Sequence, residues 1–342
     1  MKALVKTAMG AGHLELREVE KPQCSVDEVL VQVKSAAICG SDIEKYTGRN
    51  MTYKPPVTLG HEIAGVVHEL GNNVNDFEIG ARVAVEANVY ACGRCSYCRT
   101  GNENLCASRV GIGYDVDGGF AQFVKVPADM LIRVPDNISF EVASLADIYV
   151  AVHAVVDCSR IRSGDAVVIF GPGFLGLSIV QLCRLQGADP VVVVGLKKDA
   201  ARLETARELG ASATLFAEET DVLKEIQQLT RGRGADTAFE VSGSPAALLT
   251  AIEIVRRGGA VTMIGLQRES QEVPMLDVIL RQISLNGVRA YTWSNCELGM
   301  RYLSEGKLKL QHFITHEFPL EKWKDAFDLL VEGKGTKIVL KP

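Results

Sequence analysis

The 342-residue sequence predicts an α/β protein with two kinds of domain. Up to about residue 145, short β-like runs alternate with Gly, Pro and Asn turns, which is typical of a mostly β domain. From about residue 148, continuous apolar runs alternate with segments of helical periodicity. Continuous apolar strands are buried on both faces, so this part predicts a doubly wound parallel sheet covered by helices.

The expected elements follow that division. The β-like runs of the first part cover residues 4–8, 28–36, 64–70, 81–87 and 121–126. The continuous apolar runs of the second part cover residues 166–170, 191–195, 237–241 and 260–265, with helical patterns such as 177–188 and 202–211 between them. From about residue 290 the pattern is mixed and predicts two amphipathic helices and a closing strand, at 297–308, 321–333 and 336–342.

The composition excludes several classes of function. Hydrophobic residues make up 47% of the chain and charged residues 23%, as expected for a folded globular protein. A net charge of −5, without a block of like charges, offers no electrostatic attraction for nucleic acid or an anionic membrane surface. No apolar stretch is long enough to cross a bilayer. We therefore expect a cytoplasmic protein without a nucleic-acid or membrane partner.

A glycine-rich motif of the form G-x-G-x-x-G follows the apolar run at 166–170 and opens a helix. The first glycine permits the tight turn, the second lets the backbone approach a pyrophosphate, and the third lets the helix pack on the strand. This context predicts a dinucleotide-binding site. Its residues are Gly171, Pro172, Gly173, Phe174, Leu175 and Gly176.

The end of the next strand bears on the choice between NAD and NADP. An Asp or Glu there would bind the adenosine ribose of NAD, but the residue is Gly195. Leu196, Lys197 and Lys198 follow, so that two cations can pair with a 2′-phosphate. NADP is favoured on this pattern, while Asp199 lies close enough to act as a displaced ribose ligand for NAD.

Four of the nine cysteines form a C-x2-C-x2-C-x7-C pattern in a loop of polar residues. Four thiolates match the closed tetrahedral set of a structural Zn²⁺. An iron–sulfur cluster is the competing chemistry, but the proline that follows the last cysteine of ferredoxin motifs and a second cysteine set are absent. The predicted zinc ligands are Cys92, Cys95, Cys98 and Cys106.

Four ordered motifs resemble the zinc-dependent medium-chain dehydrogenase/reductase family, and most of all its polyol (sorbitol- and galactitol-type) and threonine dehydrogenase branches. They are Cys39-Gly40-Ser41-Asp42, Leu59-Gly60-His61-Glu62, the four-cysteine segment and the glycine-rich motif. The resemblance implies a GroES-like, β-rich catalytic domain of residues 1–150 and 290–342, with a structural zinc lobe at 88–110. It also implies an inserted Rossmann domain at 151–289 and a homodimer or homotetramer.

The same resemblance implies a second, catalytic zinc. Cys39 and His61 would be ligands, and Glu62 would either coordinate the ion or hold its water. The polyol branch carries a further acidic ligand seven residues before a histidine, but seven residues before His153 the residue here is Ala146. Asp147 stands one residue later, so it is either a zinc ligand displaced by one position or an ordinary helix-start residue.

The resemblance also implies a proton relay through Ser41, which follows the metal cysteine by two residues. Family members often have a histidine at the position occupied here by Glu44, so the solvent end of the relay would be a carboxylate or water. A solvated surface charge is an equally good interpretation of Glu44.

These observations predict a dehydrogenase that transfers hydride between a small secondary alcohol, polyol or sugar alcohol and NADP or NAD, with two zinc ions per chain. A phosphorylated substrate is an open alternative, with Arg49 or Lys54 as its phosphate ligand, although plain loop surface is the favoured interpretation of both residues. Two alternatives stay open: an L-threonine dehydrogenase-like enzyme, and a catalytically impaired zinc- and dinucleotide-binding sensor.

Overall fold

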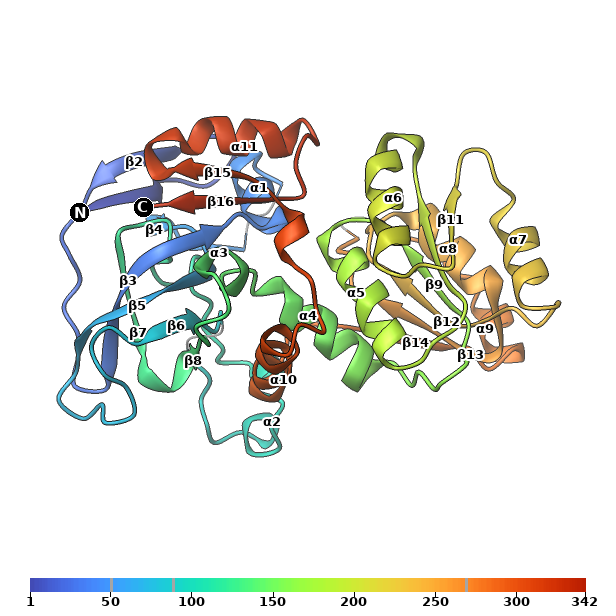
Figure 1. Cartoon of the computed structure of the whole chain (residues 1–342), viewed down its shortest axis with the longest axis horizontal. Coiled ribbons are helices and arrows are strands. Elements are labelled where there is room, and N and C mark those ends of the chain that lie inside the picture. The colour runs from blue at the N-terminus through green and yellow to red at the C-terminus, as the bar shows by residue number, and fades with distance from the viewer. Residues whose placement is uncertain (50–51, 88–89, 268–269) are drawn as a thin grey trace. The chain divides into compact units, whose positions relative to one another are not determined.

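The computed structural model describes residues 1–49, 52–87, 90–267 and 270–342. The chain divides into two compact units. Unit 1 contains Met1–Asp147 and Thr292–Pro342, and unit 2 contains Ile148–Tyr291. Both chain termini therefore lie in unit 1, where the red C-terminal strands pair beside the blue N-terminal ones (Figure 1).

Unit 1 is rich in β-structure. Its larger sheet runs β15-β16-β3-β5-β6-β8, with β7 also paired to β3, and its smaller sheet runs β2-β1-β4. The strands are β1 (Lys2–Lys6), β2 (Leu14–Glu18), β3 (Glu28–Ala37), β4 (Val57–Thr58), β5 (Glu62–Leu70), β6 (Arg82–Val85), β7 (Phe123–Pro127), β8 (Leu131–Arg133), β15 (Ile314–Pro319) and β16 (Lys337–Lys341).

Helices complete unit 1. They are α1 (Gly40–Tyr46), α2 (Ser96–Arg99), α3 (Phe140–Ala143), α10 (Trp293–Ser304) and α11 (Trp323–Val331), and α4 (Asp147–His153) starts at the last residue of the first segment of the unit. Short 3-10 turns lie at Glu103–Leu105, Ala128–Met130, Gln311–Phe313 and Leu320–Lys322.

Three adjacent strands of unit 1 lie side by side where β3 ends and β5 begins. β3 is buried over most of its length and pairs antiparallel with both β5 and β16. The register opposes Ala37, the last residue of β3, to Glu62, the first residue of β5, and to Val339 of β16. Cys39, which follows β3, and His61, which precedes β5, therefore lie at the same end of this strand pair.

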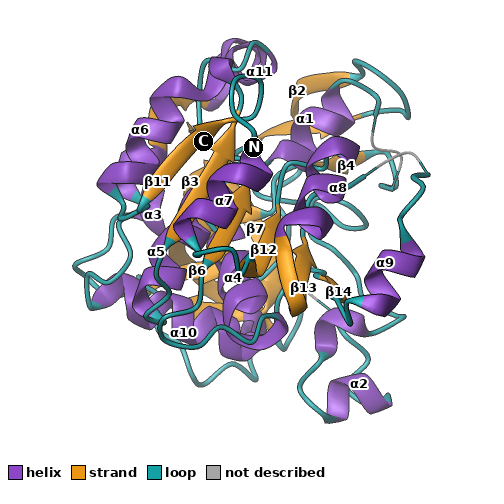
Figure 2. Cartoon of the chain, turned by 90° about the vertical axis from the view of Figure 1, so that its right-hand side faces the viewer, coloured by secondary structure: helices purple, strands orange, loops and turns teal. Residues whose placement is uncertain are grey.

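Unit 2 contains a six-stranded parallel sheet in the order β11-β10-β9-β12-β13-β14. Figure 1 draws α5 and α6 on one side of this sheet and α7 on the other, and Figure 2 shows the same strands among the helices. The strands are β9 (Val167–Phe170), β10 (Val191–Gly195), β11 (Ala213–Phe216), β12 (Ala235–Glu240), β13 (Val255–Met263) and β14 (Ser284–Gly287). The helices are α5 (Phe174–Leu185), α6 (Ala200–Glu208), α7 (Val222–Leu229), α8 (Pro245–Ile254) and α9 (Met275–Leu280), with a π-turn at Ala154–Cys158 and a 3-10 turn at Lys197–Asp199.

The strand order of unit 2 reverses at its first strand, β9. β10 and β11 lie on one side of β9, and β12 to β14 lie on the other. In sheets of this kind, ligands bind outside the carboxyl ends of the strands at the point of reversal. The glycine-rich motif directly follows β9, so it lies at that point.

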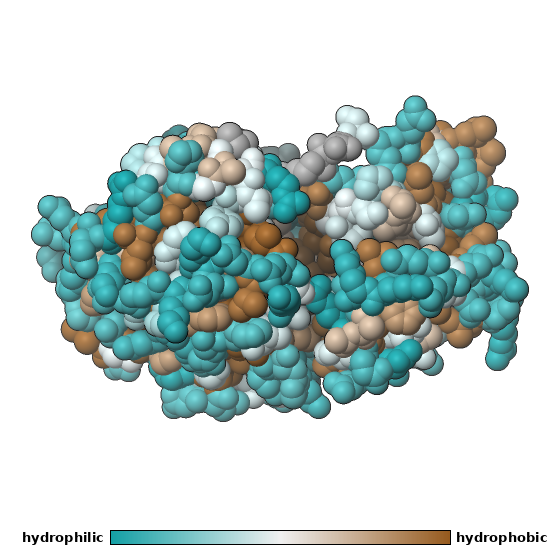
Figure 3. Space-filling model, turned by 90° about the horizontal axis from the view of Figure 1, so that it is seen from above, coloured by the Kyte–Doolittle hydropathy of each residue, from teal (hydrophilic) through white to brown (hydrophobic). Residues whose placement is uncertain are grey.

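In the described parts of the chain, no helix is long and apolar enough to cross a membrane. The face seen in Figure 3 is largely hydrophilic, and its hydrophobic residues are spread over separate areas.

Candidate active site and metal centres

Cys39 and Ser41 are placed by the start of α1. Cys39 is the N-cap residue of that helix, and its backbone N–H donates to Asp42 Oδ2 at 3.1 Å. Asp42 is fully buried, and its Oδ1 lies 3.7 Å from His61 Nδ1. A buried carboxylate beside a histidine fixes the orientation of the imidazole, as it does for histidines that bind metals.

His61 lies just before β5 and is 7% exposed. Gly60, which precedes it, has a φ of 92°, and a Cβ there would lie 2.6 Å from the ring of Phe120. Glycine is therefore required at this turn. Within the described residues, His61 Nδ1 and Glu62 Oε2 are buried and have no hydrogen-bond partner.

Asp147 lies at the start of α4 and approaches the same place. Cys39 Sγ donates to Asp147 Oδ2 at 3.2 Å, and the Nζ of Lys337 donates to the same oxygen at 2.8 Å. Lys337 also donates to Glu62 Oε1. Lys337 is 3% exposed, so its ammonium group is buried between two carboxylates.

The charged groups of this cluster shift one another's pKa values. Burial and the nearby carboxylate of Asp147 raise the pKa of the Cys39 thiol to about 12. Burial and the same carboxylate raise the pKa of Glu62 well above its usual range. Burial opposes ionisation of Asp147 too, but Lys337 and the hydrogen bond with Glu62 hold the pKa of Asp147 below its usual range. A divalent cation here would favour the thiolate and both carboxylates in their charged forms.

The four predicted catalytic-site residues form one cluster. One potential ligand atom from each of Cys39, His61, Glu62 and Asp147 lies within 4.8 Å of the others. A thiolate, an imidazole and a carboxylate are the ligands that Zn²⁺ prefers in catalytic sites. Since buried polar atoms are almost always paired, the unpaired Oε2 of Glu62 also fits a missing cation.

The four cysteines of the C-x2-C-x2-C-x7-C pattern also converge, with their sulfur atoms within 4.8 Å of one another. Cys95 Sγ lies 3.5 Å from Cys98 Sγ, and Cys92 Sγ lies 3.9 Å from it. Zn–S bonds of about 2.3 Å in a tetrahedron place sulfur atoms roughly 3.8 Å apart. The set therefore fits a structural zinc.

Backbone N–H groups stabilise these sulfur atoms as thiolates. The N–H groups of Cys92, Cys95 and Cys98 donate to the sulfurs of Cys106, Cys92 and Cys95 at 3.4–3.5 Å. Donation from the N–H groups of Arg94 and Cys95 lowers the pKa of Cys92 to about 6. Such a thiol loses its proton readily and can bind a metal as the thiolate.

The residues of the expected relay lie on α1. Ser41 Oγ accepts a hydrogen bond from Tyr114 Oη at 2.7 Å. Glu44 is half-buried, and its backbone carbonyl accepts from the N–H of Arg49 at 2.8 Å. A serine hydroxyl next to the cluster can exchange a proton with a substrate hydroxyl.

The three glycines of the dinucleotide motif differ in their surroundings, as the motif requires. Gly171 has a φ of 105° and makes the turn after β9. A Cβ on Gly173 would meet nothing within 4 Å, which leaves room for a phosphate beside the N-terminus of α5. A Cβ on Gly176 would lie 2.0 Å from the carbonyl oxygen of Gly171, so helix and strand pack too closely for any other residue.

The strand end at Gly195 has a steric constraint that the sequence did not reveal. A Cβ there would lie 2.9 Å from Pro172 Cγ, so an acidic residue needs the loop to shift. Lys197 Nζ pairs with Glu219 at 2.6 Å, and the Leu196 N–H donates to Asp199 Oδ2 at 3.1 Å. Lys198 is exposed and forms no ion pair within the described ranges.

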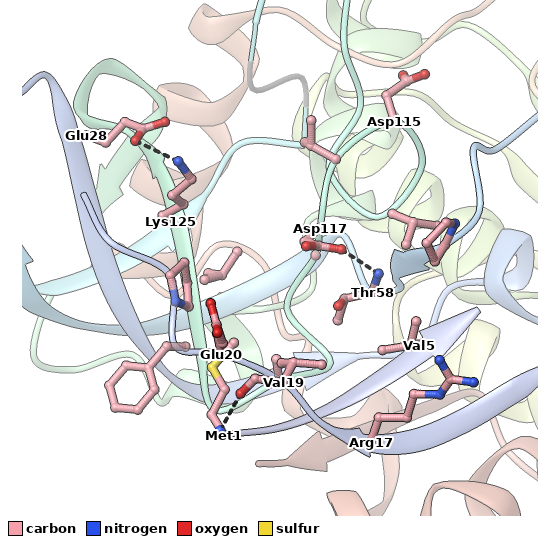
Figure 4. A pocket seen from close by; sticks show the side chains of 18 of the residues that line it. Met1, Val5, Arg17, Val19, Glu20, Glu28, Thr58, Asp115, Asp117 and Lys125 are labelled. Atoms are coloured by element: carbon pink, nitrogen blue, oxygen red, sulfur yellow. Dashed lines mark hydrogen bonds and ion pairs between the residues drawn. The ribbon is translucent and has the colours of Figure 1, made fainter. Parts of the chain in front are cut away.

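A separate groove of about 640 Å³ lies in unit 1 (Figure 4). Glu28 and Lys125 pair at 3.1 Å on one side of it, and Asp117 accepts from the Thr58 N–H on the other. Charged residues of both signs line the groove, and none of the candidate metal ligands does. The groove is therefore separate from the two candidate metal sites.

The sequence matches two families of known domains. Residues 25–136 match the alcohol dehydrogenase GroES-like domain, and residues 175–305 match the zinc-binding dehydrogenase domain. A sorbitol dehydrogenase of Halalkalibacterium halodurans is 34% identical and aligns over 100% of this chain and 99% of its own. The chain belongs to the zinc-dependent alcohol dehydrogenase family.

Other members of this family are similar over their full lengths. A D-arabitol-phosphate dehydrogenase of Enterococcus avium is 32% identical, over 99% of this chain and 97% of its own. An L-threonine 3-dehydrogenase of Bacillus subtilis is 33% identical, over 100% of this chain and 99% of its own. A solved zinc-binding dehydrogenase from Sinorhizobium meliloti, bound to NADP, superimposes with a TM-score of 0.92 at 30% identity, over 100% of this chain and 99% of its own.

These similarities confirm the predicted family, the GroES-like and Rossmann fold, and an NAD(P)-dependent oxidoreductase that acts on alcohols. Lys337 and Tyr114 are functional candidates that sequence reasoning missed. Lys337 lies 275 residues from Glu62 and 190 from Asp147, and a lysine at the start of a short strand carries no local signal. The two sites of the chain, the metal cluster and the glycine-rich loop, belong to different units.

Proposed function

We propose that the enzyme oxidises a polyol or other small secondary alcohol, and reduces the corresponding ketone, at a zinc ion held by Cys39, His61 and Asp147. The convergence of these three side chains with Glu62 in one buried cluster is the observation that carries the proposal. A second zinc, held by the four clustered cysteines, would stabilise the fold. Unit 1 would be the catalytic domain, and unit 2 the nicotinamide-cofactor domain.

A bound catalytic zinc supplies Lewis acidity, which lowers the pKa of an alcohol hydroxyl. Side chains of the protein transfer the proton and orient the metal ligands. Ser41 relays the hydroxyl proton of the substrate, because it accepts that proton while releasing its own hydrogen to water. Asp42 orients His61, and Lys337 holds Glu62 and Asp147 in place. The Gly171–Gly176 loop would hold the pyrophosphate of the nicotinamide cofactor, which would supply the acceptor for the hydride of the carbinol carbon.

The polyol class is supported by the sorbitol dehydrogenase and arabitol-phosphate dehydrogenase relatives. The threonine dehydrogenase relative at 33% identity keeps L-threonine as the second candidate substrate. The sensor alternative is disfavoured because the cluster retains a complete ligand set and a serine beside it. For a phosphorylated substrate, Lys54 is an exposed candidate, although it already pairs with Asp115 at 2.9 Å.

A substrate panel tests the proposal. Zinc-loaded protein is assayed with sorbitol, galactitol, their phosphates, 2,3-butanediol and L-threonine, each with NAD and with NADP, by following nicotinamide absorbance. We expect the highest kcat/KM with a polyol or diol. Turnover of L-threonine alone would favour the threonine dehydrogenase alternative over the polyol proposal. The absence of turnover with every alcohol tested would reject the proposed function.

We predict that NADP is preferred over NAD, with Lys198 as the main ligand of the 2′-phosphate. Lys198→Ala should raise KM for NADP about 10-fold and leave KM for NAD unchanged, because one charge-assisted contact is lost. Lys197→Ala is the matched control, since Glu219 already pairs with that side chain. A wild-type enzyme with the higher kcat/KM for NAD would contradict the prediction and favour Asp199 as a ribose ligand.

We predict that Asp147 binds zinc. Asp147→Ala should weaken zinc retention and lower kcat by about 10- to 100-fold, since a ligand that fixes the metal geometry is lost. Asp147→Asn separates the two roles, because an amide still caps a helix but is a poor zinc ligand. Full zinc content and wild-type turnover in both variants would place Asp147 outside the metal shell.

We also propose that the enzyme is a homo-oligomer. Four large apolar side chains of α9 are 52–71% exposed, and β14 is an end strand of its sheet. Light scattering should give at least a dimer, and Ile279→Glu should dissociate it, because exposed apolar patches of this kind mark interfaces. A monomer at micromolar concentration would contradict this. The four residues are Met275, Leu276, Ile279 and Leu280.

A further inference from the structure

A serine can exchange a proton with a substrate hydroxyl only if its own hydroxyl is oriented to hydrogen-bond that group. The hydroxyl of Ser41 has one hydrogen and two lone pairs. Tyr114 Oη donates to Ser41 Oγ at 2.7 Å, so one lone pair is occupied. The hydrogen of Ser41 is thereby left for an acceptor other than Tyr114.

The surroundings of Ser41 indicate where that hydrogen points. Ser41 lies in α1, two residues after Cys39, and Cys39 belongs to the candidate metal cluster. Because Tyr114 is the donor in their hydrogen bond, the Ser41 hydrogen is available to an acceptor at that cluster, where the substrate oxygen would lie.

The ring of Tyr114 is held by a buried ion pair. Lys45 Nζ lies 3.2 Å from the ring centroid and donates to Asp42 Oδ1 at 3.2 Å and to the carbonyl oxygen of Gly113 at 2.9 Å. Lys45 and Asp42 are fully buried. The imidazole of His61 packs against the same ring, with centroids 5.3 Å apart. Cation–π and ring contacts together leave the phenol little freedom.

The backbone around Tyr114 is fixed as well. Its carbonyl oxygen accepts from the Lys54 N–H at 2.8 Å. Farther along the loop, the Gly118 N–H donates to the carbonyl oxygen of Thr58 at 2.8 Å. A Cβ on Gly113 would lie 3.0 Å from the backbone of Gly60, so the loop packs directly on the segment that carries His61. Tyr114, Ser41 and His61 are thus parts of one rigid arrangement.

We propose that Tyr114 is the residue that positions Ser41. By donating to Ser41 Oγ, the phenol holds the serine hydroxyl beside the candidate metal centre and leaves its hydrogen for an acceptor other than Tyr114. Tyr114 acts through Ser41 and is therefore a positioning residue. The inference rests on the proposed function and adds to it a group that holds Ser41 in place.

Tyr114→Phe tests this most cleanly, because it keeps the ring against Lys45 and removes the hydroxyl. In zinc-loaded enzyme we expect kcat to fall about 10- to 100-fold with little change in KM, since binding is retained while the hydroxyl loses its orientation. Ser41→Ala should reduce kcat at least as much, and the double variant should be no slower than Ser41→Ala alone. Tyr90→Phe is the matched control, because its hydroxyl donates to Glu28 at 3.0 Å, away from the cluster.

A second measurement does not depend on turnover. In metal-free protein, Ser41→Ala and Tyr114→Phe should each lower Tm, and the double variant should lower it by less than the sum. The inference would be overturned by an unchanged kcat in Tyr114→Phe, or by additive effects of the two substitutions on kcat and Tm. In either case, alcohol oxidation by the wild-type enzyme would still support the proposed function. A wild type that oxidises no alcohol would overturn both, even with non-additive Tm values.

Discussion

His61→Ala should abolish catalysis while leaving the protein folded. The substitution removes one of three proposed ligands of the catalytic zinc, which contributes several kcal/mol to charge stabilisation in the transition state. We therefore expect kcat to fall about 10³-fold or more, because each 1.36 kcal/mol corresponds to a factor of ten. Zinc content should fall by one equivalent per chain, as measured by elemental analysis.

His68→Ala is the matched control for that experiment. His68 lies in β5, seven positions after His61, but its side chain is 39% exposed and contacts Lys21 and Phe123. Its removal should leave zinc content and turnover unchanged. If His61→Ala instead kept both zinc equivalents and wild-type turnover, the cluster would not be the catalytic centre.

Cys95→Ser should have the largest effect on stability. Cys95 is the N-cap residue of α2, its sulfur accepts from the Cys98 N–H, and it lies within 3.5 Å of the Cys98 sulfur. Losing a structural metal is among the few single changes that cost about 4–5 kcal/mol or more. For a domain of this size, Tm in a calorimetric scan should fall by roughly 10 °C or more.

The control for the structural site is Cys24→Ser. Cys24 is partly exposed and lies outside both cysteine-containing clusters, so its replacement should change neither Tm nor metal content. Cys95→Ser should retain the zinc at the catalytic cluster, because none of its ligands comes from this loop. An unchanged Tm in Cys95→Ser would show that the loop folds without its metal.

Much of the fold follows from local sequence pattern. Inner strands of the parallel sheet, such as β9 and β10, are fully buried and consist mainly of Val, Ile and Phe. Such continuous apolar runs predict buried strands from the sequence alone. The two end strands of that sheet, β11 and β14, escaped prediction. They are four residues long and only partly buried, so they lack a continuous apolar pattern.

The candidate site shows the same limit. Cys39, His61 and the four cysteines stand in motifs, so the sequence points to them. The spacing around Asp147 left its role open, and the start of α4 places its carboxylate beside Cys39. Lys337 and Tyr114 reach the cluster through pairing of distant strands and loops, which no local pattern encodes.

The central claim is a zinc-dependent alcohol oxidation at Cys39, His61 and Asp147. It is tested most directly by measuring zinc content and polyol oxidation in the same sample before chelation, after chelation and after zinc is restored. The proposed function predicts two zinc equivalents per chain, loss of turnover as the catalytic equivalent is removed, and recovery when zinc returns. Undiminished turnover in zinc-free protein would contradict it.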